Sequence, residues 1–189
     1  MSRGYFQKFQ IKEVVFLAIM SAVALAPCAV RPLVSSLQPL IFGISQLVTA
    51  LQIGVFFAIG LYKVRKPGSL LLMALMMGLI QLMMSPPMFL SSVLNGILIE
   101  LIVLLLFRGY EKDAAVFCAA MLHTPLSLPF NYLYNRLKKG ADSPLAAVAD
   151  RAPLAAVGMT LAVTAVSALG ALIGIKIARE LKKSGVLKK

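Results

Sequence analysis

The stretch that decides the fold runs from Phe89 to Phe107 and reads FLSSVLNGILIELIVLLLF. Glu100 is its only ionisable residue, and most other positions are leucine, isoleucine or valine. As a helix, this stretch would be about 28 Å long, which is close to the thickness of the hydrocarbon core of a bilayer. It lacks the alternation of polar and apolar residues that is typical of barrel strands. The stretch therefore predicts a helix that crosses a membrane.

Five further apolar runs lie on either side of this stretch. The six expected helices span residues 14–30, 40–62, 69–84, 89–107, 114–134 and 155–178. Because backbone groups cannot stay unpaired in lipid, such runs form helices that pack as a bundle. The chain has 189 residues, of which 60% are hydrophobic and 14% charged, so it leaves no room for a separate soluble domain. We expect an all-α integral membrane protein with six transmembrane helices in one membrane domain, residues 1–189.

The charges predict the orientation of these helices. The chain has 19 lysines and arginines against 7 acidic residues. With a cytoplasmic N-terminus, 14 of the 19 cations fall on inner segments, as the positive-inside rule requires. The outer cations are Arg31, Arg136, Lys138, Lys139 and Arg151. We therefore expect both termini in the cytoplasm of a bacterium, and a multi-pass protein of its cell membrane.

Several chemistries have no motif in the chain. His123 is the only histidine, and the two cysteines, Cys28 and Cys118, lie inside apolar runs without metal-binding spacing. There is no Walker A loop, so the chain does not hydrolyse ATP by that route. The aromatic residues do not alternate with the cations, which argues against a nucleic-acid partner. We expect no catalytic residue, no metal and no cofactor.

Polar residues inside the spans form the candidate site. A carboxyl group as deep as that of Glu100 must be paired, protonated or directed into a polar cavity. His123 lies at comparable depth, so the two side chains either bind each other or contact a ligand; Asn95 is a further partner for Glu100. We expect a pocket in the outer half of the bundle. Its candidate substrate-binding residues are Asn95, Glu100, His123, Asn131, Gln81 and Tyr132.

Prolines mark the outer half of the bundle. Pro125 and Pro129 lie four residues apart in the fifth span, where each removes a helix hydrogen bond and favours a bend that opens the outer face. Ser85, Pro86 and Pro87 predict a rigid turn between the third and fourth spans.

Two stripes of small residues allow helices to approach closely. Ala18, Ala22 and Ala26 share one face of the first span. Gly170 and Gly174, continued by Ala178, share one face of the sixth. In lipid such stripes mediate helix contacts, either within the chain or with another membrane subunit. For the glycine stripe we expect contacts within the chain.

In combination these features resemble the substrate-binding S component of an energy-coupling-factor (ECF) vitamin transporter. The segment 65–68, Arg-Lys-Pro-Gly, and the run from Asn95-Gly96 to Glu100 are similar to the YkoE-type branch of that group. That branch is associated with thiamine and its hydroxymethylpyrimidine precursor. The resemblance covers the whole chain in size and topology.

The resemblance implies a transport role without catalysis. The chain would bind a vitamin or vitamin precursor from outside the cell, with thiamine or hydroxymethylpyrimidine as the best candidate. It would dock through Ala18, Ala22 and Ala26 onto a transmembrane coupling protein that carries two ATPase subunits, and topple in the bilayer to release its ligand.

Two other kinds of protein fit part of the pattern. A small integral-membrane enzyme acting on lipid could use Glu100 and His123 as a general acid and base. Such enzymes normally also need an acidic metal cluster or a conspicuous Arg/His motif, and the sequence has neither. A stand-alone carrier is the other alternative, although the chain has no evident internal repeat.

Overall fold

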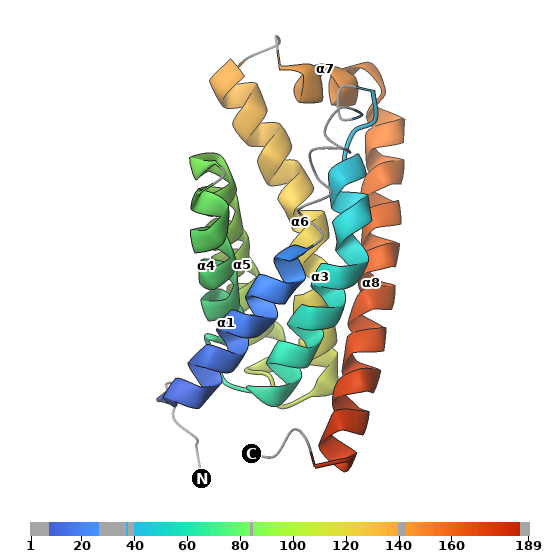
Figure 1. Ribbon diagram of the computed structural model, residues 1–189. Coiled ribbons are helices and arrows are strands. Elements are labelled where there is room, and N and C mark those ends of the chain that lie inside the picture. The colour runs from blue at the N-terminus through green and yellow to red at the C-terminus, as the bar shows by residue number, and fades with distance from the viewer. Residues whose placement is uncertain (1–7, 27–36, 38–39, 84, 140–142, 186–189) are drawn as a thin grey trace.

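The computed structural model describes residues 8–26, 37, 40–83, 85–139 and 143–185. These residues form helices joined by turns, and none of them lies in a strand. The helices are α1 (Ile11–Leu25), α3 (Ile44–Lys63), α4 (Ser69–Leu82), α5 (Pro86–Phe107), α6 (Asp113–Lys139), α7 (Pro144–Arg151) and α8 (Pro153–Lys183) (Figure 1). The prediction of an all-α fold is confirmed for the described part of the chain.

Three of these helices are long and apolar enough to cross a membrane, namely α3, α5 and α8. Helix α4 is also apolar but has only 14 residues, and α1 has 15. Helix α6 has 27 residues, but its histidine, prolines and asparagines make it less apolar than α3, α5 and α8. Length and composition therefore identify three of the six predicted spans within the described residues.

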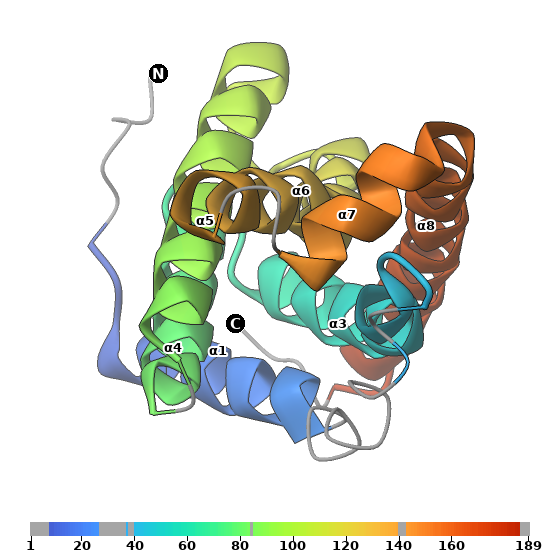
Figure 2. The ribbon, with the colours of Figure 1, turned by 90° about the horizontal axis from the view of Figure 1, so that it is seen from above.

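Two predicted boundaries are wrong. Pro86 and Pro87 do not form a turn before the fourth span; they are the first residues of α5. Proline suits this position because the first amides of a helix need no intrahelical acceptor. The segment 135–154, which separates the predicted spans 114–134 and 155–178, is not a simple linker, because it contains the last turn of α6 and the whole of α7. Helix α7 crosses one end of the bundle from α6 to α8 (Figure 2).

The expected first span, 14–30, corresponds in part to α1, which begins earlier, at Ile11. Residues 27–30 of that span, including Cys28, lie outside the described residues, as does the outer cation Arg31.

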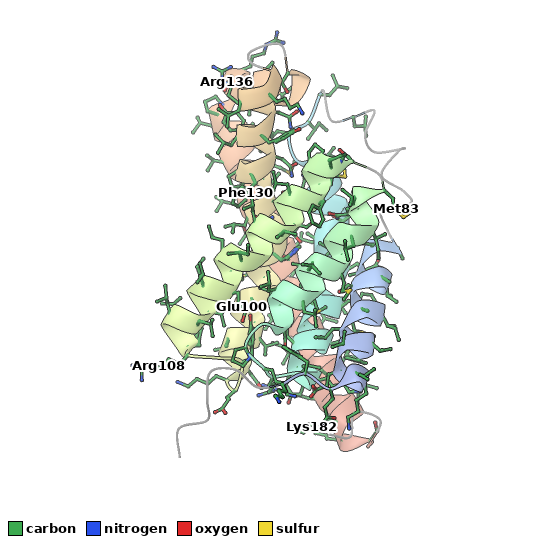
Figure 3. The ribbon with its side chains drawn as sticks, turned by 90° about the vertical axis from the view of Figure 1, so that its left-hand side faces the viewer. Met83, Glu100, Arg108, Phe130, Arg136 and Lys182 are labelled. Carbon is green, nitrogen blue, oxygen red and sulfur yellow. The ribbon has the colours of Figure 1, made fainter. Side chains whose placement is uncertain are left out.

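Basic side chains gather at one end of the molecule, which we call the basic end. At this end α1 begins, α8 ends, and turns join α3 to α4 and α5 to α6 (Figure 1). Arg108 and Lys182 lie at the basic end, whereas Arg136 lies at the opposite end (Figure 3). The two ends of the described chain are therefore on the same side of the bundle.

A network of ion pairs ties the turns of the basic end together. The Asp113 carboxylate at the start of α6 binds Arg65 at 2.5 Å and Arg179 at 2.6 Å. Lys66 binds Glu13 of α1 at 2.7 Å. Such partly exposed pairs add little stability individually. Their arrangement nevertheless joins the α3–α4 turn to α1, α6 and α8.

Helices α3 and α8 pack through glycines. A Cβ atom at Gly170 would overlap the carbonyl oxygen of Leu51, and one at Gly174 would overlap that of Val55. From the other side, a Cβ atom at Gly54 would lie 2.8 Å from the carbonyl oxygen of Ser167. The backbones therefore touch directly. This confirms the expectation that the glycine stripe of α8 serves packing within the chain.

A serine of α8 replaces a hydrogen bond that a proline removes from α6. Pro125 has no amide hydrogen, so the carbonyl of Met121, four residues earlier, lacks its usual helical partner. The hydroxyl of Ser167 donates to this carbonyl at 2.9 Å. Helices α6 and α8 are thereby joined at the point where the proline interrupts α6.

Ser167→Ala should therefore lower the free energy of unfolding by about 1–2 kcal/mol, because it leaves the part-buried Met121 carbonyl unpaired. The measurement is thermal unfolding in detergent, followed by circular dichroism because the chain has no tryptophan. Thr164→Val is the matched control, since the Thr164 hydroxyl bonds only the carbonyl of Thr160 in the same helix. Equal melting temperatures for the two variants would refute the bridging role.

Candidate binding site

The half of the bundle toward the basic end is filled by an apolar core. Its largest fully buried side chains include Phe57 of α3, Met73 and Met77 of α4, and Ile99 of α5. Ala119 of α6 belongs to the same cluster. Ser21 of α1 is also buried here, and its hydroxyl donates to the carbonyl of Met73 at 3.1 Å.

One turn farther from the basic end, the same helix faces carry polar residues. Residues four apart share a helix face. Counted away from the basic end, each of four core residues has a polar residue one turn beyond it on the same helix. These pairs are Met77 and Gln81 on α4, Ile99 and Asn95 on α5, Ala119 and His123 on α6, and Ile53 and Thr49 on α3. With Ser92, these polar residues make up what we call the polar layer, Thr49, Gln81, Ser92, Asn95 and His123, and all five are buried.

Asn95 and His123 lie at nearly the same depth. Helices α5 and α6 are antiparallel neighbours joined by a short turn at the basic end. At 1.5 Å per residue, Asn95 lies about 18 Å along α5 from Phe107, and His123 lies about 15 Å along α6 from Asp113. The polar layer therefore sits near the middle of the bundle, above the apolar core.

Two side-chain atoms of the polar layer have no hydrogen-bond partner among the described residues. They are Oδ1 of Asn95 and Nε2 of His123, in side chains that are 1% and 3% exposed. The imidazole packs against Phe57, with ring centroids 4.4 Å apart. Leaving a buried polar atom unpaired costs about 1–3 kcal/mol. Each such group calls for an explanation, and a ligand that supplies the missing partner is one.

Two further members of the layer, Ser92 and Gln81, bond each other. The hydroxyl of Ser92 donates to Oε1 of Gln81 at 2.5 Å, which joins α5 to α4. The carboxamide oxygen of Gln81 therefore already has a hydrogen-bond partner within the protein. Asn95 and His123 are the members of the layer in which a fully buried polar atom lacks a partner.

Glu100 serves a different purpose, because it caps a neighbouring helix. Its Oε1 accepts a hydrogen bond from the amide of Gly68 at 2.6 Å. Its Oε2 accepts one from the amide of Leu71 at 3.3 Å and one from the hydroxyl of Tyr110 at 2.9 Å. Gly68 is the N-cap of α4, where its φ of 89° suits glycine, and no side chain within α4 caps that end. A carboxylate at a helix N-terminus pairs orphan amides and complements the helix dipole.

The contacts of Glu100 separate it from the polar layer. It lies toward the basic end, on the Arg108 side of the bundle (Figure 3). Its hydrogen bonds go to Gly68, Leu71 and Tyr110. The expected pairing with His123 or Asn95 is not among them, and neither is the acid–base pair that a lipid-modifying enzyme would need.

Asn131 and Tyr132 lie farther toward the opposite end. The amide of Asn131 donates to the carbonyl of Ser127 within α6 at 2.7 Å. The hydroxyl of Tyr132 donates to Asp150 of α7 at 2.7 Å, and Arg136 pairs with the same carboxylate at 3.1 Å. These contacts fasten α7 across the end of the bundle. Of the six predicted site residues, the structure thus gathers Gln81, Asn95 and His123 in one layer.

The alanine stripe of α1 lies beside the buried face of that helix. The buried residues of α1 are Leu17, Ser21, Ala24 and Leu25. Ala18 is half-buried, whereas Ala22 and Ala26 are exposed. The stripe therefore remains accessible on the surface of the chain.

Comparison with known proteins agrees with this architecture. Residues 11–183 match the family described as hypothetical bacterial integral membrane protein (Trep_Strep). The chain belongs to this family. Like other Trep_Strep proteins it is an integral membrane protein, which agrees with the predicted multi-pass location in the cell membrane.

A solved structure shares the fold of this Trep_Strep chain. It is described as the crystal structure of an S-component of ECF transporter, and it superposes with a TM-score of 0.64 at 21% sequence identity. The match covers 95% of this chain and 89% of the other. No curated protein matches the chain. The fold is therefore that of an S component, as the sequence resemblance predicts.

Proposed function

We propose that the protein is the substrate-binding subunit of an ECF-type importer and that it captures a vitamin or vitamin precursor. The observation that carries this proposal is the pair of buried, unpartnered atoms in the polar layer, Oδ1 of Asn95 and Nε2 of His123. They lie in a fold shared with an S component. Thiamine and hydroxymethylpyrimidine are the first ligands to test, because of the resemblance to the YkoE-type branch.

The proposal assigns a direction to the bundle. The basic end faces the cytoplasm in keeping with the positive-inside rule, and the six helices other than α7 cross the membrane. The ligand then enters from the opposite end and reaches the polar layer. The apolar core and the network around Asp113 separate that layer from the cytoplasm. Asn131 and Tyr132 line the entrance, and Glu100 acts by holding α4 in place.

Ligand binding by the isolated chain tests this function. Titration calorimetry on the purified protein in nanodiscs should detect binding of hydroxymethylpyrimidine or thiamine. Asn95→Leu and His123→Phe should each weaken it by about 10- to 100-fold, because each removes a buried polar contact. Leu101→Ala is the matched control on α5, since Leu101 is 55% exposed and should leave affinity unchanged. Absence of binding to both compounds, or unchanged affinity in both variants, would contradict the proposal.

Docking onto the coupling module is a separate part of the proposal. Ala18, Ala22 and Ala26 would contact a transmembrane coupling protein that carries two ATPase subunits. Ala22→Trp should abolish co-purification with these partners and leave ligand affinity intact, because a large side chain prevents close helix approach. Leu105→Trp on the exposed face of α5 is the control. Complex formation by Ala22→Trp would exclude this surface.

A further inference from the structure

The polar layer is built from neutral groups. Its members are amides and hydroxyls together with one imidazole, and Gln46, which lies farther out on α3, adds a further amide. The buried side chains of the described residues include one carboxylate, that of Glu100, and no lysine or arginine. The Glu100 carboxylate already accepts hydrogen bonds from two backbone amides and from the Tyr110 hydroxyl.

Among the residues that the structure describes, a charged ligand would therefore find no counter-ion in this layer. Moving an ion out of water is unfavourable unless an opposite charge or several hydrogen bonds compensate. A neutral ligand avoids this penalty and still satisfies the unpaired atoms. Because the carboxamide oxygen of Asn95 only accepts hydrogen bonds, the ligand must offer it a donor such as a hydroxyl or amino hydrogen.

We propose that the ligand of this site is an uncharged small molecule that donates a hydrogen bond to Asn95 and also bonds His123. This inference rests on the proposed function and narrows its substrate class. It selects the neutral precursor hydroxymethylpyrimidine, which carries both a hydroxyl and an amino group, over thiamine, whose thiazolium ring is a permanent cation. It also excludes phosphate esters and vitamins that carry a carboxylate.

Comparison of three probes on the full-length protein tests the inference. Hydroxymethylpyrimidine, its phosphate ester and thiamine are titrated into the wild-type chain in nanodiscs at pH 8, where an imidazole of ordinary pKa is uncharged. The neutral compound should bind at least about 100-fold more tightly than either charged compound, which corresponds to the cost of a charge within a membrane. Thiamine or the phosphate ester binding as tightly as the neutral precursor would overturn the inference and leave the proposed binding function standing. Absence of binding to all three would remove both.

A charge variant gives an independent readout. Asn95→Asp introduces a carboxylate into the layer without changing its size, so it should raise the affinity for thiamine by at least about tenfold. Asn95→Leu is the matched control, because it should weaken binding of the neutral compound without improving that of thiamine. An unchanged affinity for thiamine in a folded Asn95→Asp protein would contradict direct contact with Asn95. If this variant does not fold, the three-probe comparison on the wild-type chain decides the question alone.

Discussion

Glu100→Ala is expected to lower the free energy of unfolding by about 3 kcal/mol, because it leaves two part-buried donors and one buried donor without an acceptor. The donors are the amides of Gly68 and Leu71 and the hydroxyl of Tyr110. The start of α4 would lose its cap and the negative charge that complements its dipole. Thermal unfolding followed by circular dichroism, together with the yield of monodisperse protein, measures the effect.

Two milder variants divide this effect into its parts. Glu100→Gln keeps an acceptor oxygen but loses the charge, so its stability should lie between those of wild type and Glu100→Ala. Tyr110→Phe removes one of the three hydrogen bonds and should cost about 1–2 kcal/mol. If Glu100→Ala instead melted like wild type and lost ligand affinity, Glu100 would be a ligand contact and the capping role would be wrong.

Gly170→Leu is expected to disrupt the fold, because the backbones of α3 and α8 touch at this position. A leucine side chain would have to push the carbonyl of Leu51 away, and small residues are what allow such close contacts between membrane helices. Overpacking of this kind typically costs about 1–3 kcal/mol, and contact with backbone rather than with a flexible side chain places the effect at the upper limit. Gly170→Ala should show the same change on a smaller scale.

Gly158→Leu is the matched control in the same helix. Beyond the adjacent residues and backbone of its own helix, no atom lies within 4 Å of a Cβ built at Gly158, so the larger side chain meets open space. Both variants are compared by thermal unfolding in the same detergent. Equal melting temperatures would show that α3 and α8 are not in direct backbone contact at Gly170.

The lipid requirement made much of the fold predictable. Apolar runs long enough to cross a bilayer indicated α3, α5 and α8 to within a few residues, since hydrocarbon thickness fixes their length. Helix α7 escaped prediction because eight residues between polar segments give no comparable signal. The start of α5 was misjudged because two prolines fit a turn as well as the first turn of a helix.

The site was predictable in its residue types and less so in its contacts. Gln81, Asn95 and His123 stand out because polar residues are rare in apolar runs. The role of Glu100 could not be read from its neighbours, because two of its partners are backbone amides about 30 residues away. The one available signal was that α4 begins after Gly68 without a capping side chain of its own. Likewise, the Tyr132–Asp150 contact depends on α7, which was not predicted.

The cap of α4 also sets an order of events during synthesis. Gly68 precedes Glu100 by 32 residues, and Tyr110 follows ten residues after Glu100. The ribosome therefore releases the first turn of α4 well before the carboxylate that completes it, while chains generally begin to fold from the N-terminal side. The N-terminus of α4 therefore lacks its capping carboxylate until Glu100 has been synthesised. The shortest segment that contains the start of α4 and every group that caps it is therefore α4 and α5 with the turn that follows.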